Sequence, residues 1–379
     1  DTISAALGLG AGIAGSGTTA VISDGADVEA NITGSVATSN GLVVSATGDN
    51  DAKSESDVAA GGAIGIGVGI LKSEIGGRVR ASTSGNVSGA TSVGVAALGD
   101  NDAISKSLSI SVGLVAGGGA SSTATITDQA NVVAEVTGGT WLVPGAAVSV
   151  TATGSNTATA TADGGSASLV GAVAVMLPTA TISGAVEAEF SGSMVDGPVD
   201  ALSLLVKARG NNTATATAIV AAVGLLGSGA GARANATIGS SATTVAKIGG
   251  GSVAVSDSVV VNAGLDNPAT STMDDGQNSA TAATKGGSGG LLTGTVMVAS
   301  STVDGAVRAD VIGNIATSGS ITIAAKGANV ADTETLALSF GLGAISGTGT
   351  TATVGTSADV YTLERIANAG GGLFYTAHE

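Results

Sequence analysis

The stretch GDNDAISKSLSISVGLVAGGGASSTATITDQANVVAEV (residues 99–136) contains the parts of a unit that recurs along the chain. A Gly-Asp-Asn segment is followed by an alternating Ser/Ala/Ile run, a glycine-laced apolar run, a second polar segment and a short strand-like end. Self-similarity at a fixed period is typical of stacked repeat architectures, so we interpret the chain as a repeat protein before considering a globular fold.

The motif Gly-x-Asn marks the period of the repeat, with one extra residue in the fifth copy. Each motif follows a strand-like run such as GLVVSAT and precedes a small-residue alternation such as TATATA. Gly and Asn favour turns, so we expect a turn at each motif. Recurrent asparagines at one place in successive turns can also form a side-chain amide ladder; the alternative is that they are present only because they fit turns. The predicted ladder is Asn50, Asn101, Asn156, Asn212, Asn267 and Asn329.

A second series of polar breaks lies between the Gly-x-Asn motifs, as in ISDG (22–25), EIGG (74–77) and ITDQ (126–129). A short strand with the pattern Val-x-Ala follows most of them. The two series together predict a chain reversal roughly every 27 residues, with coils stacked about 4.8 Å apart. We therefore predict an all-β fold, an elongated parallel β-solenoid with repeats of about 50–56 residues, each made of two rungs of about 27 residues.

The repeat divides the chain into seven units and a C-terminal segment. The predicted units are 1–50, 51–101, 102–156, 157–212, 213–267, 268–329 and 330–356. The sixth is enlarged by a polar stretch (273–290) that we expect to form a loop. Residues 357–379 depart from the repeat and have the spacing of a short helix from Val360 to Ile366, which predicts a cap or docking segment. The alternative is a frayed tail.

Composition limits both the core and the partners. The 379 residues include 62 Gly, 4 Pro, one His and no Cys, with 2% aromatic residues, so the core must consist of small aliphatic side chains. A net charge of −16 opposes binding to nucleic acid or to anionic membrane surfaces. The longest apolar runs are too short to span a bilayer, so no membrane insertion is expected. The absence of cysteine excludes a disulfide scaffold and fits either an exported bacterial product or a repeat built from small residues.

The glycine-laced runs, such as AIGIGVGIL (63–71) and SLVGAVAVML (168–177), are apolar at consecutive positions. A strand that is apolar on both faces needs a cover, which is either another sheet of the same molecule or a neighbouring molecule. We hypothesise that part of this surface mediates assembly. The candidate assembly contacts are Ile64, Ile66, Val68, Tyr361, Phe374 and Tyr375.

The acidic residues around the first two complete motifs are the one candidate for metal binding. Asp49, Asp51, Asp100 and Asp102 are predicted either to hold calcium weakly or to form a solvated acidic edge. No other cofactor is expected. Enzymatic activity is not expected either, because His378 is the single histidine and lies beside the C-terminus, which excludes a Ser-His-Asp site.

The Gly-x-Asn motifs, the TATATA-like strands, the VGxVGxGxA-like runs and the IxGxVxA strands resemble the large repetitive bacterial surface proteins known as filamentous, leukotoxin-like adhesins. The resemblance covers nearly all of 1–356. It implies an exported β-solenoid, located extracellularly or on the bacterial cell surface, that self-associates or binds a surface or glycan target. We expect a structural or adhesive role.

Two other functions stay open from the sequence. The first is binding to ice or another crystal surface through the threonines of 157–162 and 213–218, although the equivalent segments DAKSES and DAISKS interrupt the array. The second is a β-helix polysaccharide lyase, which the scattered basic residues make unfavourable.

Overall fold

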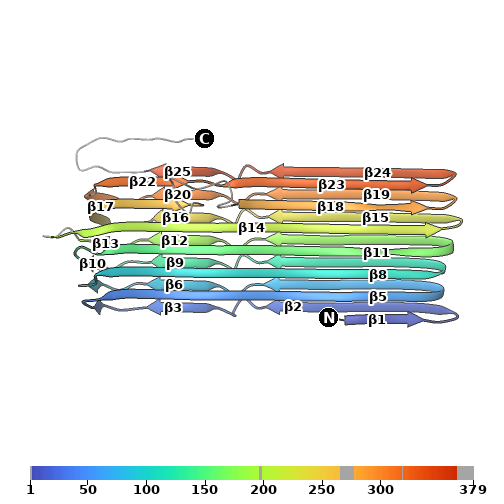
Figure 1. The fold of residues 1–379 in the computed structure, drawn as a ribbon, viewed down its shortest axis with the longest axis horizontal. Coiled ribbons are helices and arrows are strands. Elements are labelled where there is room, and N and C mark those ends of the chain that lie inside the picture. The colour runs from blue at the N-terminus through green and yellow to red at the C-terminus, as the bar shows by residue number, and fades with distance from the viewer. Residues whose placement is uncertain (1, 196–198, 265–276, 318, 365–379) are drawn as a thin grey trace.

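The computed structural model describes residues 2–195, 199–264, 277–317 and 319–364, and it consists of seven parallel β-coils stacked on one another (Figure 1). The described residues form strands, turns and bends, and none of them lies in a helix that could cross a membrane. The predicted all-β parallel solenoid is therefore confirmed.

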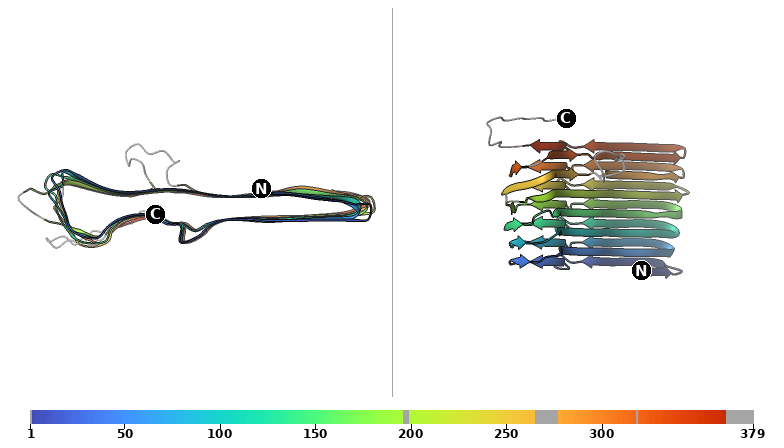
Figure 2. Two further views of the ribbon diagram at one scale, coloured as in Figure 1. Left: turned by 90° about the horizontal axis from the view of Figure 1, so that it is seen from below. Right: turned by 60° about the vertical axis from the view of Figure 1, so that its left-hand side comes forward.

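Each coil is a flattened loop with four sides, which the second coil illustrates (Figure 2). Strand β5 (Gly41–Ile75) first runs along one side as a front strand as far as Gly61, makes a U-turn, and comes back from Ile64 as a return strand. The short back strand β6 (Val79–Thr83) and the end strand β7 (Val87–Ser88) then close the coil.

The other coils repeat these four sides. The remaining front and return strands are β1 (Thr2–Leu7), β2 (Ala11–Ile22), β8 (Ser92–Ile126), β11 (Ala147–Ile182), β14 (Ala201–Gly224), β15 (Gly227–Ile238), β17 (Ser252–Ala263), β18 (Gln277–Gly289), β19 (Leu292–Val303), β22 (Ser320–Ala325), β23 (Ala328–Phe340) and β24 (Gly343–Val354). The remaining short back strands are β3 (Val28–Ile32), β9 (Val132–Val136), β12 (Val186–Phe190), β16 (Thr244–Ile248), β20 (Val307–Val311) and β25 (Val360–Glu364). The remaining end strands are β4 (Val36–Ala37), β10 (Thr140–Leu142), β13 (Ser193–Met194) and β21 (Asn314–Thr317), with the first residues of β17 in the same position.

The register shows that one coil is one whole repeat. Asn50 pairs with Asn101, 51 residues away, and Asn212 pairs with Asn278, 66 residues away. The expectation of two 27-residue rungs per repeat is therefore wrong. The polar breaks of the second series, such as residues 23–27, only bend the chain at the corner between a return strand and a short back strand.

The position of the chain reversal also differs from the expectation. Gly48 and Asn50 lie inside the front part of β5, so the turn predicted at Gly-x-Asn is wrong. The chain reverses instead within the glycine-laced runs, where Gly62 has a φ of 157°. The alternation of outward and inward side chains continues through the Gly-x-Asn motif, because its glycine and its asparagine both occupy inward positions.

The stack is flat. The longest axis of the molecule lies along the strands, and the seven coils extend over a shorter distance at right angles to them (Figure 1). Viewed along the stack, the coils superpose closely (Figure 2, left). Sheets of many strands normally twist, and flat ones are typically stabilised by side-chain ladders or by stacking on another sheet.

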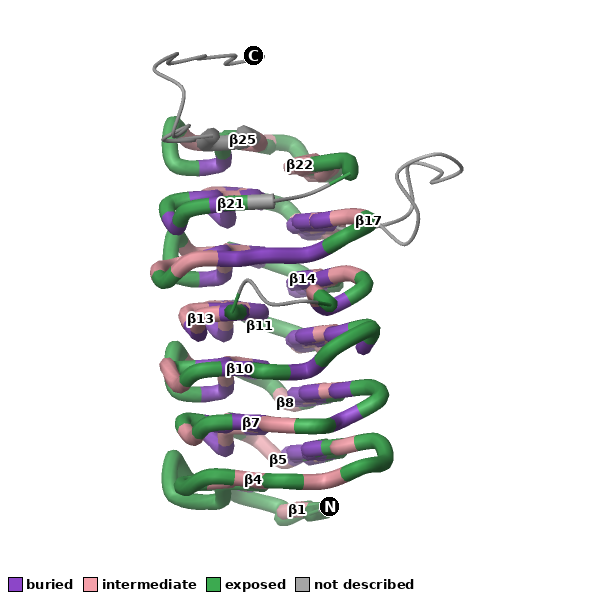
Figure 3. Tube along the Cα trace, turned by 90° about the vertical axis from the view of Figure 1, so that its left-hand side faces the viewer, coloured by how far each residue is buried: buried purple, intermediate pink, exposed green. Residues whose placement is uncertain are grey.

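The core has a wide and a thin part. Near the end strands, seen facing the viewer in Figure 3, the coil is filled by valines together with Trp141 and Phe190, whose rings meet edge to face at 5.4 Å. Between the front and return strands the core is mainly alanine, with serine and glycine. Ser54 and Ser73, for example, share a 2.8 Å hydrogen bond across this thin layer. The predicted small-residue core is thus present where the two strands lie closest.

Two local expectations are corrected. Residues 360–364 form the strand β25, which pairs with β20, so the helix expected there is wrong. Residues 365–379 lie outside the described residues. The sixth coil resumes as the strand β18 at Gln277, so the part of the expected loop from 277 to 289 is instead an integral part of the sheet.

Candidate interaction surfaces

The asparagines of the repeat form a hydrogen-bonded ladder through the interior. Asn101 accepts a 2.8 Å hydrogen bond from Nδ2 of Asn50 and donates one of 2.8 Å to Oδ1 of Asn156. The predicted amide ladder is therefore present, but on the inner side of strands rather than in turns. Its members are Asn50, Asn101, Asn156, Asn212, Asn278 and Asn329. The predicted member Asn267 lies outside the described residues, and Asn278 occupies its place.

The glycine of each Gly-x-Asn motif has a packing role. It faces inward where the front strand lies closest to a short back strand, and a Cβ on Gly99 would lie 2.4 Å from Cγ2 of Val132. A Cβ on Gly154 would lie at the same distance from Cγ2 of Val186. Contacts this short would force the backbone apart. The glycine of the motif thus lets the front strand and the short back strand approach closely, and its asparagine supplies the amide of the ladder.

Charged side chains cover the sheet of short back strands. Arg80 donates from Nε to Glu135 at 2.6 Å, and Lys247 lies 3.3 Å from a carboxylate oxygen of Glu189. Burial raises the pKa of Glu187, and the neighbouring Glu189 raises it further, while Lys247 lowers it. These contacts join adjacent coils, so they favour the observed register over a shifted one.

The four aspartates predicted as a calcium site lie on the outer side of the front strands. Asp49 pairs in register with Asp100, and Asp51 with Asp102, in adjacent coils. Burial, and then the charges of Asp51 and Asp100, raise the pKa of Asp102, which Lys106 partly opposes. The described residues contain no group of three or more His, Cys, Asp or Glu side chains that could hold a metal ion. These aspartates form an acidic edge in the structure, and weak calcium binding by them stays a prediction.

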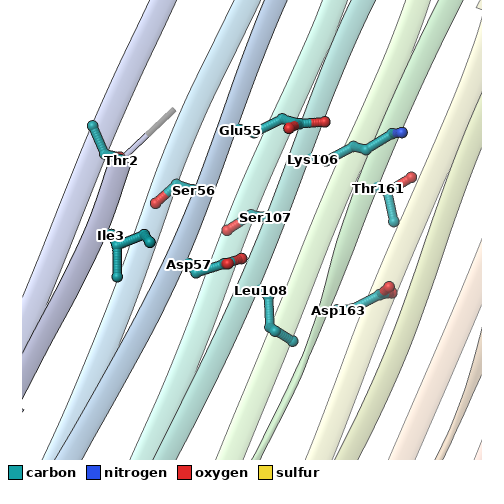
Figure 4. Close-up of a pocket in the computed structure, with 10 residues that line it drawn as sticks. All are labelled: Thr2, Ile3, Glu55, Ser56, Asp57, Lys106, Ser107, Leu108, Thr161 and Asp163. Atoms are coloured by element: carbon teal, nitrogen blue, oxygen red, sulfur yellow. The ribbon is translucent and has the colours of Figure 1, made fainter.

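A shallow hollow on the front face lies beside this edge (Figure 4). Glu55, Asp57 and Asp163 line it together with Lys106. Burial raises the pKa of Asp163, although a hydrogen bond from the backbone N–H of Ile219 lowers it. Within the described residues, the buried hydroxyls of its serines have no hydrogen-bond partner, so they are not paired with a base as an activated nucleophile would be.

A threonine array occupies the middle of the front face. The outward threonines of 157–162 pair in register with those of 213–218 in the next coil. In the segment 279–284, Thr281 continues the array, while Ser279 and Ala283 take the other two outward positions. On the other side, 102–107 ends the array with acidic, apolar and basic residues at these positions. The regular array is therefore limited to two coils, with one threonine in a third.

The return strands present an exposed apolar surface, which we call the return face. Ile64, Ile66 and Val68 are 46%, 38% and 42% exposed, whereas the alternate positions, such as Gly65 and Gly67, face inward. This is the reverse of the usual strand with its apolar side inside. An internal cover for these residues, one of the two explanations considered from the sequence, is therefore wrong within the described chain.

The return face extends well beyond Ile64, Ile66 and Val68, the three of its residues that the sequence indicated as assembly contacts. The period-two alternation of glycine and branched residues could have identified the rest, because only one side of such a strand can face a thin core. Other exposed members are Ile13, Ile70, Val115, Val173, Val175, Leu177, Leu292, Val296 and Ile345.

The U-turns carry a second apolar feature, which we call the leucine edge. Six of the seven coils place an exposed leucine there, the second coil having Ala63 instead, and these leucines line shallow hollows at the edge of the slab. The edge adjoins the return face, so the two form one continuous apolar region. Its members are Leu9, Leu114, Leu169, Leu225, Leu291 and Leu342.

Three aromatic residues were also predicted from the sequence as assembly contacts, and the described one, Tyr361, does not lie in this apolar region. Tyr361 belongs to β25, on the sheet of short back strands. Phe374 and Tyr375 lie outside the described residues. Their role in assembly stays a prediction.

Comparison of the chain with protein-family models, curated proteins and solved structures finds no match. The resemblance to filamentous adhesins therefore depends on the repeat motifs alone, and what the chain itself establishes is a parallel β-solenoid with an internal asparagine ladder and an uncovered apolar return face.

Proposed function

We propose that the chain is a scaffold segment of an extracellular bacterial structural or adhesive protein, either in a surface adhesin or in a self-associating fibre. The observation that carries the proposal is the uncovered return face. Contiguous exposed apolar surface on a soluble protein indicates an interaction site, and here it is repeated from coil to coil on a flat support. The resemblance of the repeat motifs to those of exported adhesins supports the extracellular location.

The slab would act by holding surfaces in fixed positions. In-register main-chain pairing and the asparagine ladder set the spacing of the coils, so outward side chains repeat at that spacing. The return face and the leucine edge supply apolar contacts to other molecules. The middle of the front face is polar, whereas its strands end near the U-turns in exposed apolar side chains such as Ile110, Val223 and Phe340. This role requires no cofactor and no catalytic residue.

Electron microscopy of the purified full chain tests the proposal. We expect lateral assemblies, either sheets or fibres, at micromolar concentration in physiological salt. Particles that remain single slabs under all conditions, together with no binding to cell-surface glycans, would contradict a scaffold or adhesive role.

The location requires a separate test in the source cells. Antibodies against the chain should label intact cells or extracellular material without permeabilisation. Labelling that appears only after the cells are opened would exclude an extracellular role. A polysaccharide degradation assay should show no activity.

The threonine array favours a second candidate, binding to ice or another crystal surface. In-register stacking of the threonines in 157–162 on those in 213–218 produces a flat, regular hydroxyl surface. Thermal hysteresis that is lost in Thr215→Lys but kept in Val175→Lys would support this function. Self-association with no thermal hysteresis would favour the scaffold.

A further inference from the structure

One column of the return face alternates glycine and valine from coil to coil. These residues are neighbours in the parallel register, so they lie in one line along the stack: Gly15, Val68, Gly119, Val175, Gly231, Val296 and Gly347. The adjacent column follows the same small–large order through Ile70 and Leu177, with Arg233 as an exception. In the glycine–valine column, coils two, four and six therefore form apolar ridges about 10 Å apart, with glycine-floored grooves between them.

No contact within the described chain requires glycine at the groove positions. A Cβ on Gly119 would lie 3.7 Å from the carbonyl oxygen of Val175, and one on Gly231 would lie 3.9 Å from that of Val296, both ordinary contact distances. Neither glycine has a positive φ. They differ in this from Gly99, where a Cβ would collide with the opposite layer.

Glycine inside a strand weakens the strand, because it loses more conformational freedom on folding than any other residue. In strands it often marks a place where another backbone approaches closely. Since the groove glycines have open space above them, a close approach there has to come from a second molecule.

The ridges and grooves are complementary to those of an identical copy. A two-fold axis parallel to the strands, placed between the third and fourth coils, sets large residues opposite small ones. Val175 then faces Gly119 of the second copy, and Val68 faces its Gly231. The same axis places Ile66 opposite Gly229 and Val115 opposite Gly171 in the neighbouring columns. The flatness of the stack keeps the six paired coils aligned (Figure 2).

The return face also has the size and chemistry of a protein interface. Its four apolar columns pass through Ile64, Ile66, Val68 and Ile70 of the second coil. They cover about 20 Å along the strands and about 34 Å along the stack, roughly 700 Å², which approaches the ~800 Å² per partner of a standard stable interface. Among the described residues of these columns, Arg233 is the one charged side chain. Charge depletion at the centre is typical of the core of an interface.

We propose that two copies of this chain dock return face to return face, with the valine ridges of each copy seated in the glycine grooves of the other. The inference depends on the proposed scaffold function and identifies its partner as a second copy of the same chain.

Sedimentation equilibrium of the full chain tests the docking, with Gly231→Val and Gly119→Val as groove-filling variants. Both add apolar surface, so non-specific stickiness would make association tighter. Ridge-in-groove docking predicts the opposite, a dissociation constant raised at least tenfold. Gly94→Val is the matched control, because this outward glycine lies on the front face with its Cβ position 3.7 Å from Ser149 Oγ. It should leave the dissociation constant unchanged, and unfolding curves should show that all the variants are folded.

The docking of two copies can fail in this experiment while the scaffold function still holds. If the groove-filling variants associate as tightly as the wild type, or more tightly, the docking is overturned while an assembling scaffold still stands. A wild-type chain that stays monomeric at about 100 μM would also overturn the docking. Fibres seen by microscopy under the same conditions would then have to form through another surface.

Discussion

Nδ2 of Asn156 donates a 2.8 Å hydrogen bond to Oδ1 of Asn212, although 56 residues separate the two side chains in the sequence. Asn156 also accepts a 2.8 Å bond from Asn101, so one buried amide connects three successive coils. Water cannot replace these partners in the interior, which makes an unpaired amide at this place costly.

Replacing Asn156 with alanine should lower the free energy of unfolding by about 2–5 kcal/mol, because it leaves a buried donor on Asn101 and a buried acceptor on Asn212 unpaired. Urea unfolding followed by circular dichroism measures the loss. Asn50→Ala is the control: Asn50 makes a single bond in the ladder, to Asn101, so its loss should be clearly smaller. Equal losses would mean that the ladder does not stabilise the stack.

Gly99→Ala should destabilise the protein by about 1–3 kcal/mol, since the new methyl group would overlap Val132. Gly94→Ala, in the same strand but facing outward, should change stability by less than about 1 kcal/mol. The double variant Gly99→Ala/Val132→Ala should recover part of the loss in a thermal unfolding experiment. No recovery would show that the cost is not steric.

Glu187→Gln should stabilise the protein at pH 7. Burial, with Glu189 and Glu135 nearby, raises the pKa of Glu187 above its ordinary value of 4.5, and this outweighs Lys247 and Arg308. Because the folded state then holds the proton more tightly than the unfolded state, this group lowers stability as pH rises above that ordinary value.

The difference in melting temperature between Glu187→Gln and the wild type should therefore be largest at neutral pH and should disappear below about pH 4. A difference that is constant with pH would contradict the assignment to ionisation of this carboxyl.

Phe190→Ala should cost about 3–5 kcal/mol, because the ring is fully buried against Trp141 and nothing can fill the space it leaves. Trp141 is the single tryptophan of the chain, so its fluorescence should also shift to the red in the variant. Phe340→Ala is the control, since that ring is 67% exposed; its unfolding midpoint should stay close to that of the wild type. Comparable losses from both variants would exclude the packing explanation.

The repeat predicted the fold well because the stacking contacts are made between identical positions. Asn50 and Asn101 occupy the same place in two units, so a period in the sequence becomes a contact in space. The coil length was not predictable in the same way. A polar break such as residues 23–27 looks the same whether the chain bends at a corner or completes a turn, and only long-range pairing distinguishes the two.

The candidate surface was predicted in part. The apolar run containing Ile64 and Val68 was recognised, but the sequence alone leaves open whether the same chain covers it. The different roles of the glycines were harder to predict, because Gly99 and Gly119 both occur in runs of small residues in the sequence. One faces an opposing valine at 2.4 Å and the other faces open space, and this difference exists only after the chain has coiled.

The register between β5 and β8 has a mechanical consequence. The main-chain hydrogen bonds between these two strands point along the stack, from residue 41 to residue 75 on one side, and β6–β9 and β7–β10 continue the same row around the coil. Tension applied along the stack therefore pulls on a long row of bonds at the same moment, and a coil can come away only by opening the row as a whole or by peeling it from one edge. Pulling on such a slab should produce evenly spaced rupture events, each releasing one coil of slack chain.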